Sequence, residues 1–220
     1  GLSSTGAVRV DIVELSAAVI EAARWFNGSN HDLLKSPFVQ MRVDDGRNYL
    51  QLTTKKYDIV TADLMLPYLA GAGSLYSVDY FRLARRVLAS DGLMIQWIPQ
   101  DHEIRYKMTL RGFLAAFPYV TAWGGGLLVG SMTPLSLDRE AFERKLAEPG
   151  LAALFREEGF SSFDALLGAY VANRHQLVSY AGRGPMLTDD LPISEYFLSL
   201  PESHDAHFTF PPPDPKELLH

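Results

Sequence analysis

Three acidic side chains in this sequence follow apolar stretches of strand length. Glu14 ends "VRVDIVE", Asp45 lies in "DDGR" after "FVQMRV", and Asp63 lies in "TADL" after "YDIV". If these stretches are parallel strands of one sheet, their carboxyl ends meet at one edge, which is where open α/β sheets bind their ligands. We therefore expect Glu14, Asp45 and Asp63 to line one crevice.

The chemistry of a carboxylate gives these acids two kinds of role. A carboxylate accepts two hydrogen bonds from vicinal hydroxyl groups, which suits the ribose of a nucleoside, and Glu14 is our candidate for that contact. A single acid after a strand is more often a helix cap or part of a solvated turn. Three acids at successive strand ends favour ligand binding.

The elements that must position these acids follow from the hydrophobic pattern. Apolar runs of strand length alternate with segments of helical periodicity, as in a parallel sheet covered by helices. This order predicts a doubly wound α/β fold. We expect strands at 8–15, 38–45, 57–64 and 91–99, and two short strands joined at the glycines within 121–131. We expect helices at 46–54, 77–88 and 105–117, and one after Ser16 as N-cap, with Val19, Ile20, Ala23 and Phe26 on one face.

The pattern changes after Pro134 and predicts three regions. Residues 1–133 form a Rossmann-like nucleoside-binding domain, residues 134–200 a helical appendage packed on it, and residues 201–220 an extended proline-rich tail. Within the appendage, short amphipathic helices are expected around 138–147, 150–158 and 161–172, with no further strand.

Composition excludes several classes of protein. The 220 residues are 47% hydrophobic and 21% charged, which is typical of a globular protein with a sizeable core. A formal charge of −6 without a basic stripe argues against nucleic acid as a partner. The chain has no cysteine, which excludes disulfides and zinc-thiolate sites and fits a cytoplasmic setting. No apolar run reaches the roughly 20 residues that span a bilayer, and no secretion signal is expected.

Several of these motifs together resemble one family. "VDIVELSAAVIEAARWF", "DDGRNYL", "YDIVTADL", "GAGSLYSVDYFRLARRVLASDGLMIQWIP" and "TDDLPISEY" are similar to the spermidine synthase-like polyamine aminopropyltransferases. The similarity runs from about Val8 to Tyr196 and is greatest to the bacterial branch in which such a domain follows a membrane-embedded, transporter-like region. It implies the class I fold of S-adenosylmethionine-dependent methyltransferases.

The resemblance also implies roles for individual residues. Glu14 matches the acid that binds ribose, and Asp45 with Gly46 matches the pair beside the adenine amine. Asp63 matches the acid that orients and deprotonates the attacking amine. The implied donor is decarboxylated S-adenosylmethionine, and a negatively lined crevice suits both a sulfonium donor and a cationic amine.

The sequence departs from the family pattern at three points. The family has a glycine-rich loop and a full helix before the ribose acid, but only "GLSSTG" precedes the first strand here. Because a parallel crossover needs a dozen or more residues, we expect the first strand and helix of the fold to be absent from this chain. The family's second acid, three residues after the catalytic one, is Leu66 here. The N-terminal β-hairpin region of the family has no counterpart.

Other side chains are candidates for contact with the amine. Tyr76 and Gln96 lie where the third and fourth strands reach the crevice, whereas Trp97 is more typical of a core or pocket wall. Asp190 in "TDDLPISEY" either caps the crevice or begins a helix. His204 and His207 have a metal-like spacing but lie in a polar tail, so we expect no metal.

The sequence therefore predicts transfer of an aminopropyl group from decarboxylated S-adenosylmethionine to a small amine. Two alternatives remain open. One is a methyltransferase that uses S-adenosylmethionine itself, and the other is a non-catalytic nucleoside- or polyamine-sensing domain of a larger membrane protein. A homodimer is one assembly that the resemblance allows.

Overall fold

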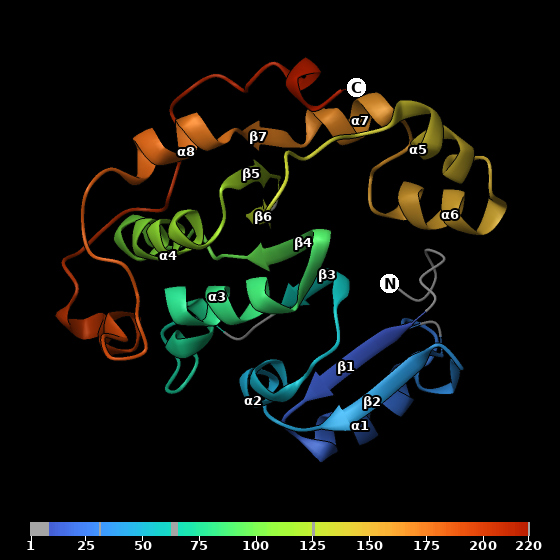
Figure 1. The fold of residues 1–220 in the computed structure, drawn as a ribbon, viewed down its shortest axis with the longest axis horizontal. Helices are drawn as coiled ribbons and strands as arrows, with labels where there is room; N and C mark the ends of the chain where they lie inside the picture. Colours follow the sequence, from blue (N-terminus) through green and yellow to red (C-terminus); the bar gives the residue numbers. More distant parts are fainter. Residues whose placement is uncertain (1–8, 31, 63–65, 125, 220) are drawn as a thin grey trace. The chain divides into compact units, whose positions relative to one another are not determined.

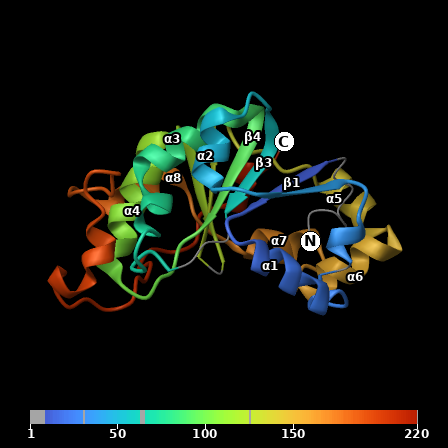
Figure 2. The same cartoon turned by 90° about the horizontal axis from the view of Figure 1, so that it is seen from below.

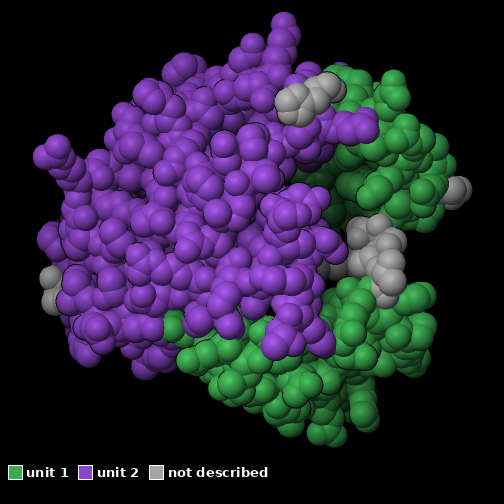
Figure 3. All heavy atoms as spheres, viewed as in Figure 1, with its two compact units in different colours: residues 1–53, 139–163 green, residues 54–138, 164–220 purple. Residues whose placement is uncertain are grey.

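The computed structural model describes residues 9–30, 32–62, 66–124 and 126–219 (Figures 1 and 2). Contacts between residues divide the chain into two compact units, coloured separately in Figure 3. Unit 1 comprises residues 1–53 and 139–163, and unit 2 comprises residues 54–138 and 164–220. The helices that follow residue 138 are therefore shared between the units.

Unit 1 is built on two parallel strands. Strands β1 (Val10–Glu14) and β2 (Val39–Val43) pair over their full length, so that Val10 faces Val39 and Glu14 faces Val43. The helical elements of unit 1 are α1 (Ala17–Ala22), η2 (Ala23–Phe26), η3 (Leu33–Lys35), α2 (Gly46–Leu52), α5 (Arg139–Leu146) and α6 (Pro149–Glu157). Both strands end at the same edge, because they run in the same direction.

The first helix differs from its prediction in two ways. The predicted apolar face is not buried: Val19 is 54% exposed and Phe26 is 63% exposed, because no described part of the chain covers them. Ser16 is at the N-cap position, as predicted, but its side chain makes no capping hydrogen bond. The Ser16 N–H instead donates to the Glu14 carboxylate, at 2.8 Å.

Unit 2 contains a mixed five-stranded sheet with the strand order β3-β4-β6-β5-β7. Its strands are β3 (Tyr57–Ala62), β4 (Leu88–Trp97), β5 (Tyr119–Trp123), β6 (Leu127–Ser131) and β7 (Tyr170–Ala172). Strands β3 and β4 are parallel, and the three remaining pairs are antiparallel. The predicted hairpin at the glycines is confirmed as β5–β6. Gly126 has a φ of +81° there, and a Cβ at this position would lie 2.7 Å from the Ile98 carbonyl oxygen.

Helices α3 (Val78–Val87), α4 (Glu103–Ala116) and α8 (Arg174–Ala181) pack side by side against this sheet (Figure 2). The helix predicted at 77–88 is confirmed, and Phe81, Ala84 and Val87 form its buried face. Phe81 and Phe113 meet edge to face, with their ring centroids 5.0 Å apart. This aromatic contact joins α3 to α4 and fixes the helix that follows the loop after β3.

The C-terminal part of the chain holds elements that the sequence analysis did not predict. Helix α7 (Phe163–Gly168) ends earlier than expected, and β7 follows it, which corrects the expectation of no further strand. The remaining short helices are η4 (Gly73–Tyr76), η5 (Ile193–Ser199) and η6 (Pro215–Leu218). The tail is extended and is fixed to unit 2 by backbone hydrogen bonds, among them Leu137 N–H to the Leu218 carbonyl at 2.8 Å.

Candidate functional site

Two of the predicted acids lie at the same edge of unit 1. Glu14 is the last residue of β1, and Asp45 follows the end of β2. The Asp44 N–H donates to the Glu14 carbonyl at 3.1 Å, which holds the two chain segments together just beyond the strands. The carboxyl edge of this parallel pair therefore carries both Glu14 and Asp45.

The Glu14 carboxylate is half-buried and oriented by its own turn. One oxygen accepts the Ser16 N–H at 2.8 Å, at the start of α1. A carboxylate has two oxygens with about four acceptor positions, so this bond leaves most of its capacity for a ligand. The turn thus fixes the side chain without saturating it.

Asp45 has a structural role in addition to any role in binding. It is the N-cap of α2, and its Oδ1 accepts the Asn48 N–H at 2.9 Å. Asp44 supports this turn by accepting the Asp45 N–H at 2.8 Å. Gly46 begins the helix, and a Cβ there would meet nothing within 4 Å beyond its chain neighbours, so the space at this glycine is open.

Unit 2 carries the remaining described candidates. Gln96 lies near the end of β4 and pairs in register with Ala62, the last residue of β3. The Gln96 side chain is fully buried, and its Nε2 donates to the Trp97 carbonyl at 3.0 Å. Its Oε1 is buried without a hydrogen-bond partner among the described residues. Asp63 lies outside the described residues.

Tyr76 and Asp190 lie in very different surroundings. Tyr76 is 0% exposed and ends the loop that connects β3 to α3. Asp190 is exposed in a turn that is closed by the bridge between Thr188 and Leu191. Its neighbour Asp189, which the sequence analysis did not single out, accepts a hydrogen bond from the Ser77 hydroxyl at 2.7 Å. Roles in substrate binding for Tyr76 and Asp190 stay predictions.

Two further charged groups contact the loop after β3, and the sequence analysis assigned neither of them to it. The Glu195 carboxylate accepts the N–H groups of Gly71 and Gly73, each at 3.0 Å. The Arg105 guanidinium lies 4.7 Å from the ring centre of Tyr68 and donates to Asp101 at 2.9 Å. Glu195 belongs to the quoted motif "TDDLPISEY", but nothing in the sequence indicates its partners 122 and 124 residues away.

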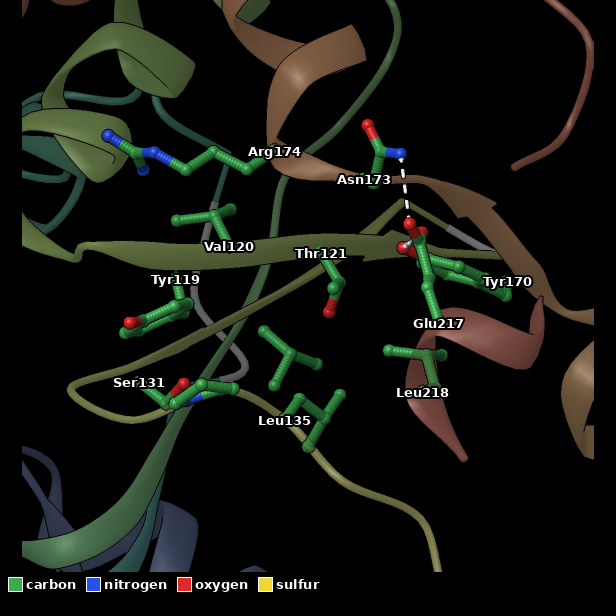
Figure 4. Close-up of a pocket in the computed structure, with 12 residues that line it drawn as sticks. Tyr119, Val120, Thr121, Ser131, Leu135, Tyr170, Asn173, Arg174, Glu217 and Leu218 are labelled. Atoms are coloured by element: carbon green, nitrogen blue, oxygen red, sulfur yellow. Dashed lines mark hydrogen bonds between the residues drawn. The ribbon is translucent and has the colours of Figure 1, made fainter. Parts of the chain in front are cut away.

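A cavity of about 170 Å³ lies elsewhere in unit 2, between β5, β6, α8 and the C-terminal tail (Figure 4). None of the predicted site residues lines it. Its polar side chains have hydrogen-bond partners: the Tyr170 hydroxyl and the Asn173 amide both donate to Glu217, and Arg174 donates to the carbonyls of Phe117 and Leu114. Because these groups are satisfied, we assign the cavity to packing under the tail.

The described residues include no group of three or more His, Asp or Glu side chains placed to hold a metal ion. No helix in the described ranges is both long and apolar enough to cross a membrane.

Comparison with known proteins finds similarity to spermine/spermidine synthases and polyamine aminopropyltransferases. Residues 6–113 match the family model of the spermine/spermidine synthase domain. A polyamine aminopropyltransferase from Pyrobaculum islandicum is 27% identical over 165 residues, which cover 67% of this chain and 57% of that protein. A polyamine aminopropyltransferase from Nitrosomonas europaea is 28% identical over 66% of this chain and 49% of its own length. The chain thus spans about half the length of the curated relatives it matches.

Solved structures support the same fold. A probable spermidine synthase from Corynebacterium glutamicum aligns with a TM-score of 0.57 at 22% identity, covering 82% of this chain and 63% of that one. A spermidine synthase in complex with the transition state analogue AdoDATO aligns with a TM-score of 0.51 at 16% identity, over 70% of this chain and 61% of that one. Human methyltransferase-like protein 13 in complex with SAH also aligns with a TM-score of 0.51, at 18% identity, over 67% of this chain and 71% of that one.

These structures establish an α/β fold of the methyltransferase type, and the matched domain contains Glu14, Asp45 and Asp63. The chain is therefore similar to the spermidine synthase-like family over residues 6–113, which match a spermine/spermidine synthase domain.

Proposed function

We propose that this domain transfers an aminopropyl group from decarboxylated S-adenosylmethionine to an amine. The observation that carries the proposal is the placement of Glu14 and Asp45 at the carboxyl ends of adjacent parallel strands, within a spermine/spermidine synthase domain. A nucleoside offers ribose hydroxyls and an adenine amine as donors, and two acceptor side chains at one strand edge match these groups.

In this proposal the donor nucleoside binds along the carboxyl edge of unit 1. Glu14 accepts hydrogen bonds from the ribose hydroxyls, since the Ser16 N–H occupies only part of its capacity. Asp45 accepts from the adenine amine through the oxygen that does not cap α2, and the open space at Gly46 admits the base. Negative charge at this edge also favours a sulfonium donor.

The proposed reaction is a nucleophilic displacement. The lone pair of a neutral amine forms a C–N bond to the aminopropyl carbon that is attached to sulfur. The C–S bond breaks, and its electron pair stays on sulfur as the neutral thioether methylthioadenosine. Asp63 takes the proton that the amine must lose, because a protonated amine has no lone pair to donate.

Gln96 supports an amine acceptor rather than an acidic one. Its Oε1 is buried and has no partner among the described residues, and leaving such an acceptor unpaired is unfavourable. An amine N–H supplies the missing donor. Leu66 occupies the position of the family's second acid, which would hold a second ammonium group. We therefore infer that the preferred acceptor is less highly charged than putrescine.

The proposal extends to the setting of the chain. We infer a cytoplasmic domain, in agreement with the absence of cysteine, that acts as a homodimer and is tethered to a membrane-embedded region in its parent protein. The charge of −6 favours cationic small molecules over nucleic acid as partners.

A comparison of two donors tests the proposed function. The protein is incubated with a panel of monoamines and diamines and with either decarboxylated or intact S-adenosylmethionine, and the products are identified by mass spectrometry. We expect aminopropylated amine from the decarboxylated donor alone. Methylated amine from intact S-adenosylmethionine would instead show a methyltransferase. Nucleoside binding with neither product would indicate a sensor.

A further inference from the structure

The loop between β3 and α3 is fixed by a segment far along the chain. We call residues 66–76 the acceptor loop and residues 187–195 the clamp segment; both belong to unit 2. The acceptor loop follows β3 in the sequence and ends just before α3. Its conformation therefore shapes the carboxyl edge of β3 and β4, where Gln96 lies.

Glu195 makes the central contact of this arrangement. Its Oε2 accepts the Gly71 N–H and its Oε1 accepts the Gly73 N–H, both at 3.0 Å. Hydrogen bonds from backbone N–H groups to an ionised carboxylate are stronger than neutral ones. Because each oxygen has its own amide donor, the carboxylate holds two positions of the loop at a fixed separation.

The glycines allow this close approach. Gly71 has a φ of +83°, a conformation that side chains disfavour. A Cβ at Gly73 would lie 2.8 Å from the Ser194 Oγ and 2.9 Å from the Glu195 Oε1, both closer than real Cβ contacts. The loop therefore has glycine at both places where the clamp segment reaches its backbone.

Further contacts fix both ends of the loop. After its last residue, the Ser77 hydroxyl donates to Asp189 at 2.7 Å, and the Val78 N–H donates to the Leu187 carbonyl at 2.9 Å. Near its start, Tyr68 lies under the guanidinium of Arg105, which is 4.7 Å from the ring centre. Glu195 is thus the contact that holds the middle of the loop.

We propose that Glu195 is a positioning residue for the acceptor amine. It acts through the backbone of Gly71 and Gly73 and holds the acceptor loop in the shape that the amine requires beside Asp63 and Gln96. The expected effect of Glu195 on the KM of the amine rests on the proposed aminopropyl transfer. The proposal also gives the clamp segment, which lies beyond the matched residues 6–113, a part in the reaction.

The first variant that tests the proposal is Glu195→Gln. An amide side chain has one acceptor oxygen, so it can accept one of the two N–H groups and presents its own NH₂ to the other. Glu202→Gln is the matched control, because Glu202 is an exposed acid of the same unit, seven residues further along the chain. Gly73→Ala is the second variant, since its methyl group displaces Glu195 from the loop while the acid remains.

The first measurement is hydrogen exchange of the acceptor loop in the wild-type protein and the three variants. We expect the amides of Gly71 and Gly73 to exchange roughly tenfold faster, or more, in Glu195→Gln and Gly73→Ala than in the wild type or Glu202→Gln. Unchanged exchange in Glu195→Gln would show that Glu195 does not hold the acceptor loop, whatever reaction the protein catalyses.

The second measurement is steady-state transfer, with the donor and the amine varied separately. We expect Glu195→Gln to raise the KM of the amine roughly tenfold while the KM of the donor stays unchanged, and we expect Gly73→Ala to do the same. If both variants lose kcat to the same extent while the KM of the donor and the KM of the amine stay unchanged, the loop serves folding alone. That result would overturn the positioning role. If the wild-type protein forms no aminopropylated product, the proposed function fails. The hydrogen-exchange measurement still shows whether Glu195 holds the acceptor loop.

Discussion

The Ser77 hydroxyl donates a 2.7 Å hydrogen bond to the Asp189 carboxylate across 112 residues of sequence. The same hydroxyl accepts the Tyr80 N–H at 3.1 Å and so caps the N-terminus of α3. The Asp189 N–H donates to Asp79 at 3.1 Å, which makes the contact reciprocal. The start of α3 and the clamp segment therefore stabilise each other.

Replacing Ser77 tests this contact directly. Ser77→Ala removes the helix cap and leaves Asp189 without this donor, so we expect the free energy of unfolding to fall by about 1–3 kcal/mol. Denaturant unfolding measures the change. Ser90→Ala, at an exposed serine of the same unit, should unfold like the wild type. A Ser77→Ala protein as stable as the control would show that the contact contributes nothing.

Glu14 is expected to determine nucleoside affinity. Glu14→Gln replaces charge-assisted hydrogen bonds to the ribose by neutral ones, so methylthioadenosine should bind more weakly by ~1.5–3 kcal/mol. Isothermal titration calorimetry gives the value. Glu21→Gln removes the same charge from an exposed position on α1 and should leave affinity unchanged. Equal affinities for wild type and Glu14→Gln would remove Glu14 from the proposed site.

Leu66 is expected to restrict the acceptor. A leucine cannot accept a hydrogen bond, so a second ammonium group buried against it would be unpaired. We predict weak transfer to putrescine by the wild type and a lower KM for putrescine in Leu66→Asp, by roughly tenfold. Leu69→Asp places the same charge at a 42% exposed position of the same loop and should have little effect. Efficient use of putrescine by the wild-type protein would contradict this account of Leu66.

Alkaline stability should depend on Tyr106. Burial raises the pKa of Tyr106 above its ordinary value of about 10, and the neighbouring Tyr180 raises it further. Because the folded-state pKa is the higher one, the contribution to stability is present below about pH 10 and is lost as the pH rises through and above it. Tyr106→Phe keeps the ring contacts to Tyr180 and Phe208 but cannot ionise. Its unfolding free energy should fall less steeply than that of the wild type from roughly pH 9 to pH 11, and parallel curves would exclude Tyr106 as the cause.

Local patterns predicted most of unit 2 correctly. Phe81, Ala84 and Val87 recur at helical spacing and are buried in α3, and the glycines between two apolar runs mark the β5–β6 hairpin. Such features depend on neighbouring residues, so they can be found in the sequence. Strand order likewise placed Glu14 and Asp45 at one edge, because the direction of β1 and β2 alone determines it.

Features that depend on distant contacts were missed. Strand β7 has three residues, too few to show an alternating pattern, and it is formed by pairing with β5. Helix α8 did carry a local signal, since Asn173 and Gln176 form a capping box. The stripe of α1 was correctly periodic, but periodicity does not show whether another element covers it, and Val19 is mainly exposed. No local signal connects Glu195 to Gly71 and Gly73.

The central claim is that an amine displaces the thioether of decarboxylated S-adenosylmethionine at this domain. Quantitative mass spectrometry of both products in one reaction tests it most directly, with the wild type and Asp63→Asn compared side by side. We predict one methylthioadenosine for each aminopropylated amine in the wild type, and neither product above background in Asp63→Asn, because the amine then keeps its proton. Methylthioadenosine without aminopropylated amine, or equal turnover by Asp63→Asn, would contradict the proposed reaction.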